Sequence, residues 1–155
     1  MLSVFCSPSR YVQGRDATAQ LGEHLAHCGL TGPAYIVASG RVQAMLADTW
    51  TATLGEAGID FTVGLFNGEC TSAEIERGVA EATAAGARLV IGVGGGKALD
   101  TARAIAGTLD VPVANCPTLA SSDAPCSALS VVYTAEGVFE RLIFYPRNPE
   151  LVLVD

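Results

Sequence analysis

Residues 87–100 read ARLVIGVGGGKALD, and this stretch decides the fold of the 155-residue chain. Its first half is a continuous apolar run, as in a buried parallel strand, and the residues after the glycines have helical apolar spacing. A glycine-rich turn between a strand and a helix lets backbone N–H groups close around an anion, and the helix N-terminus adds a favourable partial charge. The stretch therefore predicts a phosphate-binding turn, with Lys97 placed to meet the same phosphates.

The spacing of this turn differs from two common phosphate loops. Ala98 stands where a Walker A loop has the Ser or Thr that holds magnesium. Lys97 stands where the dinucleotide pattern G-x-G-x-x-G has its third glycine. A tight turn that binds nothing is the alternative, but one glycine would serve for that. Three glycines followed by a lysine favour phosphate binding.

Strand-like and helical segments alternate on both sides of the turn. We expect strands at 35–38, 61–66, 88–93, 111–114 and 151–155, and helices at 16–28, 41–56, 71–85 and 97–107. Two further runs, 128–134 and 139–145, flank a turn and predict a β-hairpin near the C-terminus. This order is typical of an α/β fold with a doubly wound, mostly parallel open sheet, Rossmann-like, whose ligands bind at the carboxyl ends of the strands.

Composition narrows the classes of function. Residues 1–155 have the length of one domain, half of them are apolar, and the net charge of −7 disfavours a nucleic-acid partner. No apolar run is long enough for a membrane span, and the N-terminus lacks a basic signal region. Five cysteines without a C-x-x-C pair indicate reduced thiols and a cytoplasmic protein. His24 and His27 could face one metal ion, but an ordinary polar helix face is the favoured interpretation.

Several segments resemble the glycerol dehydrogenases of the metal-dependent (iron-type) alcohol dehydrogenase superfamily. The most specific is PTLASSDAPCSALSVVYT at 117–134, joined by 10–14, 66–70, 94–102 and 148–155. The resemblance runs through most of the chain. It implies the N-terminal nucleotide-binding half of an enzyme that oxidises glycerol or related 1,2-diols to dihydroxyacetone-type ketones, with NAD as the hydride acceptor.

The same resemblance implies roles for individual residues. Expected cofactor contacts are Ser39, Gly94, Gly95, Gly96, Lys97, Asp100, Thr118, Ser121, Ser127, Leu129 and Tyr133, and Asp123 is expected to bind the polyol hydroxyls. Hydroxyl and carboxylate groups suit both tasks. Each also has a purely structural alternative: the Ser and Thr hydroxyls would bond their own loop, Tyr133 would pack on the sheet, and Asp123 would cap a turn or a helix.

The metal ligands of the superfamily, one Asp and two His that bind zinc or iron, have no match in this sequence. We expect them in a C-terminal helical domain absent from this chain, supplied by a longer protein or a separate chain, and we expect the 155 residues alone to be inactive. An apolar face meant for that domain would favour self-association, and a homo-oligomer is expected. A nucleotide-binding module without catalysis, or a dehydroquinate synthase-like or glycerol-1-phosphate dehydrogenase-like enzyme, are the alternatives.

The residue after the second predicted strand leaves the choice between NAD and NADP open. Where the superfamily usually has an Asp after the second strand, Val37 and Ala38 are followed by Ser39. An Asp there accepts from the 2′-hydroxyl of NAD and repels the 2′-phosphate of NADP. Ser39 removes that repulsion and Arg41 could pair with the phosphate, so NADP is a second candidate; the alternative is that Arg41 faces solvent.

Overall fold

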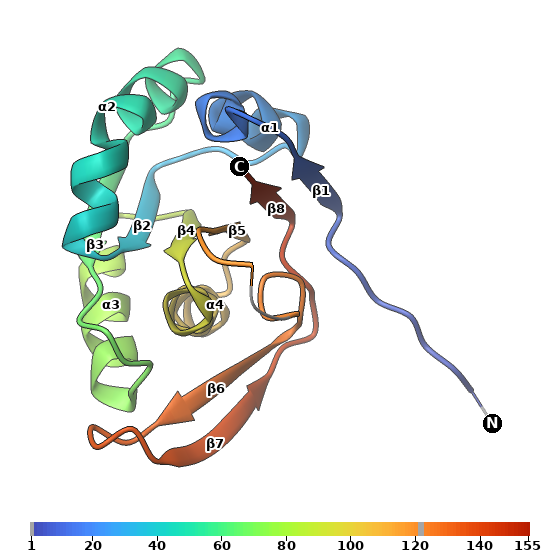
Figure 1. Ribbon diagram of the computed structural model, residues 1–155, viewed down its shortest axis with the longest axis vertical. Coiled ribbons are helices and arrows are strands. Elements are labelled where there is room, and N and C mark those ends of the chain that lie inside the picture. The colour runs from blue at the N-terminus through green and yellow to red at the C-terminus, as the bar shows by residue number, and fades with distance from the viewer. Residues whose placement is uncertain (1, 121–122) are drawn as a thin grey trace.

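Six parallel strands form one sheet in the computed structural model, which describes residues 2–120 and 123–155 (Figure 1). Across the sheet they are β1 (Arg10–Gln13), β8 (Leu151–Val154), β5 (Val113–Pro117), β4 (Leu89–Gly94), β2 (Ala34–Ala38) and β3 (Phe61–Leu65). Every pairing in this sheet is parallel, which confirms the predicted doubly wound α/β architecture. β2 and β4 are buried along their whole length because both faces of the sheet are covered.

Helices cover the two faces in separate layers. The 3-10 helix η1 (Ala17–Gln20), α1 (Leu21–His27) and α2 (Gly40–Glu56) lie on one face, where Trp50 and Leu54 pack against Ile36 and Ile91. The other face carries α3 (Ser72–Ala84) and α4 (Gly96–Leu109), whose apolar side chains form a second core. None of the helices in the described part of the chain is long and apolar enough to cross a membrane.

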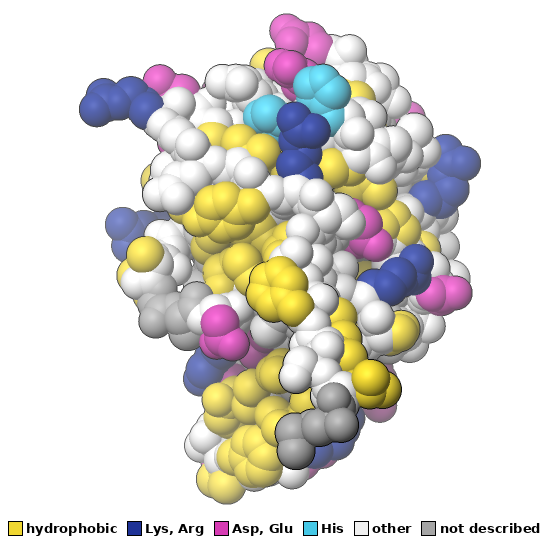
Figure 2. Space-filling model, turned by 90° about the vertical axis from the view of Figure 1, so that its right-hand side faces the viewer, with side chains coloured by type: hydrophobic (Ala, Val, Ile, Leu, Met, Phe, Trp, Pro, Cys, Tyr) yellow, Lys and Arg dark blue, Asp and Glu magenta, His cyan; other side chains and the backbone are white. Residues whose placement is uncertain are grey.

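The predicted hairpin is present as β6 (Leu129–Tyr133) and β7 (Phe139–Phe144), which pair antiparallel and lie beside α4 (Figure 1). Val132 points into the core of that layer. The opposite face of the hairpin exposes Phe139 and Phe144, and Figure 2 shows hydrophobic side chains gathered at this lower end of the molecule. The hairpin thus closes the α3–α4 layer without joining the main sheet.

Three elements differ from the sequence-based expectation. Strand β1 was not expected, because it has only four residues and every second one is exposed, as in an edge strand. The expected helix 16–28 is interrupted, because the carboxylate of Asp155 accepts hydrogen bonds from the N–H groups of Asp16 and Thr18 and η1 forms there. The strand expected at 111–114 begins at Val113, because α4 runs on to Leu109.

The order of the strands reverses direction between β2 and β4, in the middle of the sheet. β2 leads through α2 outward to β3, whereas β4 lies on the other side of β2. α2 and α4 therefore leave neighbouring strands on opposite faces. In open α/β sheets this reversal of strand order is where ligands bind, outside the carboxyl ends of the strands.

Candidate functional site

The glycine turn lies at this reversal and leaves room for a ligand. β4 ends at Gly94, whose φ of 154° belongs to a region that L side chains rarely adopt, and a Cβ there would lie 2.9 Å from the Cβ of Ala98. A Cβ on Gly95 would meet no heavy atom within 4 Å. Gly95 caps α4 without offering a side-chain acceptor. The N–H of Ala98 donates to the carbonyl of Gly95 at 3.0 Å, so the N–H groups of Gly96 and Lys97 at the start of α4 are the ones placed to meet an anion, as in a phosphate cradle.

A cavity of about 340 Å³ opens directly on the turn. Six of the predicted cofactor residues line it: Ser39, Gly94, Gly95, Gly96, Lys97 and Thr118. Ser39 stands at the carboxyl end of β2, where its hydroxyl accepts a hydrogen bond from the N–H of Val42 at 3.3 Å and caps α2. Thr118 follows β5 and donates its N–H to the carbonyl of Gly94 at 3.0 Å. Residues from three neighbouring strands thus converge on one cavity.

A second cavity, of about 490 Å³, continues along the same edge of the sheet. Thr118 lines both cavities, and the second also borders Tyr11 of β1, Val152 of β8 and the loop residue Cys126. Because Thr118 lines both, the two cavities adjoin at the carboxyl ends of the strands, and we call the pair the cleft. Two adjoining cavities suit an extended ligand such as a dinucleotide with a small molecule beside it.

Lys97 does not stand free at the mouth of the cleft. Its Nζ lies 2.5 Å from Oε2 of Glu69 and 5.1 Å from the centre of the Tyr133 ring. The hydrogen bond with Glu69 raises the pKa of Lys97. The structure therefore brings together Lys97 and Tyr133, both predicted, with Glu69, to which the sequence assigned no role. No local signal pointed to Glu69, because it lies 28 residues before Lys97.

Asp100 has its carboxylate in the interior of the protein. Oδ1 accepts a hydrogen bond from Arg103 at 2.9 Å and Oδ2 accepts one from the N–H of Val131 at 3.3 Å. Burial raises the pKa of Asp100, and the guanidinium of Arg103 acts in the opposite direction. Sequence reasoning did not single out Arg103, although its i, i+3 spacing from Asp100 is a usual signal for an ion pair on a helix.

The loop between β5 and β6 carries the remaining predicted residues. Asp123 is exposed, and its carbonyl accepts hydrogen bonds from the N–H groups of Cys126 and Ser127. Ser127 and Leu129 are half-buried on the same loop and at the start of β6. The Ser127 hydroxyl lies 3.5 Å from the carbonyl of Ala124, so the loop satisfies part of its own backbone. Ser121 lies outside the described residues.

A metal site does not fit the described residues. None of them form a group of three His, Cys, Asp or Glu side chains that could hold a metal ion. His24 and His27 lie on α1 with ring centres 6.0 Å apart, and His27 faces Glu23 at 4.0 Å on the same helix.

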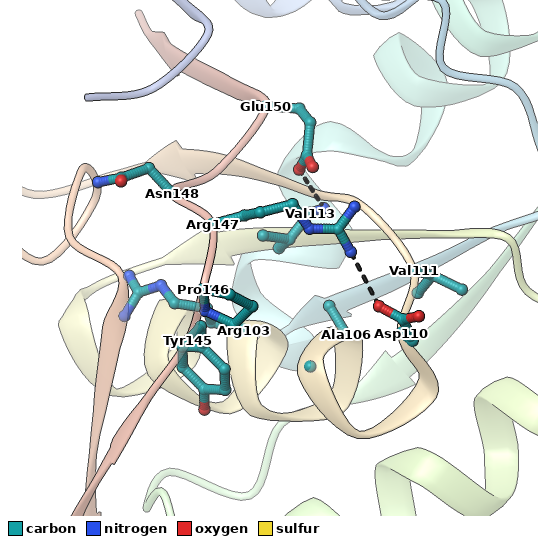
Figure 3. A pocket seen from close by; sticks show the side chains of 11 residues that line it. Arg103, Ala106, Asp110, Val111, Val113, Tyr145, Pro146, Arg147, Asn148 and Glu150 are labelled. Atoms are coloured by element: carbon teal, nitrogen blue, oxygen red, sulfur yellow. Dashed lines mark hydrogen bonds and ion pairs between the residues drawn. The ribbon is translucent and has the colours of Figure 1, made fainter. Parts of the chain in front are cut away.

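A smaller cavity of about 100 Å³ lies elsewhere and is not part of the cleft (Figure 3). It sits at the amino ends of β5 and β8, opposite the glycine turn. Arg147 pairs with Asp110 at 2.9 Å, and Glu150 accepts a hydrogen bond from the N–H of Val113 at 2.9 Å. Arg147, Asp110 and Glu150 are thus bonded to one another or to the backbone, whereas Nε of Arg103 is buried without a hydrogen-bond partner among the described residues.

Comparisons with known proteins point to one family. The sequence profile of the family "Iron-containing alcohol dehydrogenase" matches residues 8–155. A glycerol dehydrogenase of Pseudomonas putida is 47% identical over 149 residues, which is 96% of this chain and 40% of that protein. A glycolaldehyde reductase of Halobacterium salinarum is 46% identical over 155 residues, which is 100% of this chain and 42% of that protein.

A comparison with solved structures points to the same family. A probable glycerol dehydrogenase from Sinorhizobium meliloti superposes with a TM-score of 0.89 at 35% identity, covering 100% of this chain and 41% of that one. The chain spans about two fifths of the length of the relatives it matches. Because the family profile covers nearly the whole sequence, the chain belongs to the iron-containing alcohol dehydrogenase family.

Proposed function

We propose that this chain is the dinucleotide-binding part of a dehydrogenase that interconverts a small polyol and its ketone, with NAD as the hydride carrier. The observation that carries the proposal is the cavity in which Ser39, Gly95 and Thr118 meet at the reversal of strand order. The open space at Gly95 supports close approach of a pyrophosphate to the backbone. NAD supplies the hydride acceptor when it is bound.

The residues of the cleft divide the task between them. The N–H groups of the first turn of α4 bind the pyrophosphate, and Lys97 adds a positive charge beside it. Ser39 faces the adenosine ribose from the end of β2. Tyr133, whose ring centre lies 5.1 Å from Nζ of Lys97, extends the cofactor site at the mouth of the cleft, and Ser127 and Leu129 are further proposed cofactor contacts. Asp123 accepts hydrogen bonds from neighbouring hydroxyls of the substrate.

The substrate class rests on the relatives. Glycerol and glycolaldehyde, in the names of relatives at 47% and 46% identity, are both small and carry hydroxyl groups. We infer a hydroxylated substrate of two or three carbons for the enzyme of which this chain is part. The zinc or iron ion that the resemblance implies is assigned no ligand among the described residues of this chain.

The choice between NAD and NADP depends on Ser39 and Arg41. Ser39 has no charge to repel a 2′-phosphate. Arg41 lies two residues after Ser39, at the start of α2, and its exposed side chain can pair with that phosphate. We infer that the site accepts both dinucleotides. A cytoplasmic location and a homo-oligomeric state also remain proposals; exposed Phe139 and Phe144 on the hairpin support self-association.

Calorimetric titration of the chain with NAD and, separately, NADP tests the proposal. We expect saturable one-site binding of both cofactors. Adenosine alone should bind more weakly than either, because it lacks the pyrophosphate that the glycine turn holds. Absence of binding for both dinucleotides at millimolar concentration would overturn the proposal that these residues form a working cofactor site.

A further inference from the structure

Three side chains from different parts of the fold donate hydrogen bonds to backbone carbonyls of the loop that carries Asp123. The carbonyls of Ala124, Pro125 and Cys126 follow one another in the sequence. Arg103 of α4 donates to the first of these carbonyls. Asn115 of β5 donates to the second at 2.9 Å, and Asn148, just before β8, donates to the third at 2.8 Å.

We call the three donors Arg103, Asn115 and Asn148, with the carbonyls that they bind, the seat of the loop. The surrounding fold fixes the positions of these donors. Arg103 is 2% exposed and Asn115 is fully buried. Figure 3 shows the side chains of Arg103 and Asn148 extending in the same direction, away from the pair of Arg147 and Asp110. The N–H groups of Arg103 and Asn115 that face the loop are bonded to its carbonyls, whereas Nε of Arg103 and Oδ1 of Asn115 are buried without a hydrogen-bond partner among the described residues.

The Asp100–Arg103 pair extends the seat into the hairpin. Arg103 also donates to the carbonyl of Leu129. Asp100 accepts the N–H of Val131 on its carboxylate and the hydroxyl of Ser130 on its carbonyl, the latter at 2.7 Å. Both ends of the segment 124–131 are therefore bonded to α4, the helix whose N-terminus forms the glycine turn.

The seat borders the cleft. Pro125 and Cys126 line the second cavity, and a Cβ on Gly96 would lie 3.7 Å from the Cβ of Ala124. The N–H groups of Cys126 and Ser127 close a turn on the carbonyl of Asp123, at 2.9 and 3.1 Å. The hydrogen bonds to the three carbonyls therefore determine where Asp123 lies relative to the glycine turn.

We propose that Arg103, Asn115 and Asn148 are positioning residues that hold the loop of Asp123 and Ser127 against the cofactor turn, so that substrate and cofactor meet at a fixed distance. The proposal rests on the proposed function for its purpose but not for its geometry. It also gives Asp100 a different task from the one implied by resemblance: it orients Arg103 and the start of β6 rather than contacting the cofactor.

Asn148 offers the sharpest test because it is only half-buried, whereas changes at Arg103 or Asn115 also cost folding free energy. Asn148→Asp keeps the shape of the side chain but removes the N–H donor and sets a negative charge beside a carbonyl. Gln20→Glu is the matched control. It makes the same change from amide to carboxylate on the exposed side chain of Gln20 in η1, which lines neither cavity of the cleft.

The first measurement is amide hydrogen exchange, followed residue by residue by NMR in the chain without ligand. In Asn148→Asp we expect the amides of Cys126 and Ser127 to exchange about tenfold faster or more, the equivalent of one lost hydrogen bond. Amides of β2 serve as the internal reference for global stability and should not change. Unchanged exchange at Cys126 and Ser127, or an equal increase in β2, would overturn the proposal.

The second measurement is calorimetric titration with NAD. We expect Asn148→Asp to weaken binding severalfold and Gln20→Glu to leave it unchanged. Faster loop exchange with unaltered NAD affinity would refute a positioning role for the seat. If the unsubstituted chain binds neither NAD nor NADP, the proposed function fails, and the exchange result alone still decides whether the three side chains hold the loop.

Discussion

The ammonium of Lys97 and the carboxylate of Glu69 form an ion pair at 2.5 Å across the mouth of the cofactor cleft. An incoming pyrophosphate must share or replace this partner. In Glu69→Gln the competing charge is gone, so we expect NAD to bind about two- to fivefold more tightly at low salt, the range of exposed ion pairs. Calorimetric titration at two ionic strengths measures this. Glu56→Gln, at the end of α2, is the control and should change nothing.

A side chain at Gly95 should fill the space that the phosphate needs. Gly95 has an extended backbone and no heavy atom near the place of a Cβ, so Gly95→Val is compatible with the fold. We expect NAD affinity to fall on the order of tenfold or more, since backbone approach to the anion is blocked. The control is Gly55→Ala in α2, which also has open space and should bind NAD normally. Equal affinity in both variants would show that the turn does not hold the cofactor.

Ser39→Asp should separate the two dinucleotides. Aspartate caps a helix as well as serine does, so the bond to the N–H of Val42 and the fold are kept. We expect NADP binding to weaken by about tenfold or more while NAD binding holds or improves, because the carboxylate repels the 2′-phosphate and accepts from the 2′-hydroxyl. Parallel titrations with both cofactors measure the ratio. A loss of equal size for NAD and NADP would contradict this assignment of Ser39.

A pH dependence of stability is expected from Tyr35 and Glu81. The buried Tyr35 donates its hydroxyl to Glu81 at 2.7 Å, and this bond holds the pKa of Glu81 below its usual value. A carboxyl whose pKa is lowered by folding stabilises the protein above its unfolded pKa, and this contribution is lost as pH falls through the folded pKa.

Tyr35→Phe should therefore lower the free energy of unfolding at pH 7 more than at pH 3. The difference should be about 1 kcal/mol or less, since Glu81 is partly exposed. Urea unfolding at the two pH values provides the measurement. Tyr11→Phe is the control, because the Tyr11 hydroxyl donates only to the uncharged side chain of exposed Gln13. Its effect on the free energy of unfolding should be the same at both pH values. The same difference in both variants would count against the Glu81 bond as its source.

Thiol reactivity should divide the cysteines by burial. Burial raises the pKa of Cys70 to about 11 and of Cys116 to about 12, so neither forms the reactive thiolate at pH 8. Exposed Cys6 should react with a disulfide reagent within the mixing time, while Cys70 and Cys116 should react only after denaturation. Mass spectrometry of the labelled peptides distinguishes them. Early labelling of Cys116 would mean that the core around β5 opens readily.

The sequence predicted the alternation of strands and helices because each buried segment carries its own apolar period. The phosphate turn was equally local, since strand, glycines and lysine are adjacent. β1 was missed because its stability comes from pairing with β8, which lies far along the chain. Glu69 was missed for the same reason, since its partner Lys97 lies 28 residues further along the chain. The pairing of Arg103 with Asp100 had a local signal in its i, i+3 spacing, but the bonds of Arg103 to the loop carbonyls depend on tertiary packing, which no spacing in the sequence encodes.

The three seated carbonyls belong to the backbone, and this has a consequence for protein engineering. Arg103, Asn115 and Asn148 hold peptide groups that any residue would present. Side chains on the loop, such as Leu119, Asp123 and Ser127, can therefore be randomised while the path of the chain is retained. A library at those positions, with the three donors kept constant, is the economical route to altered substrate preference in this scaffold.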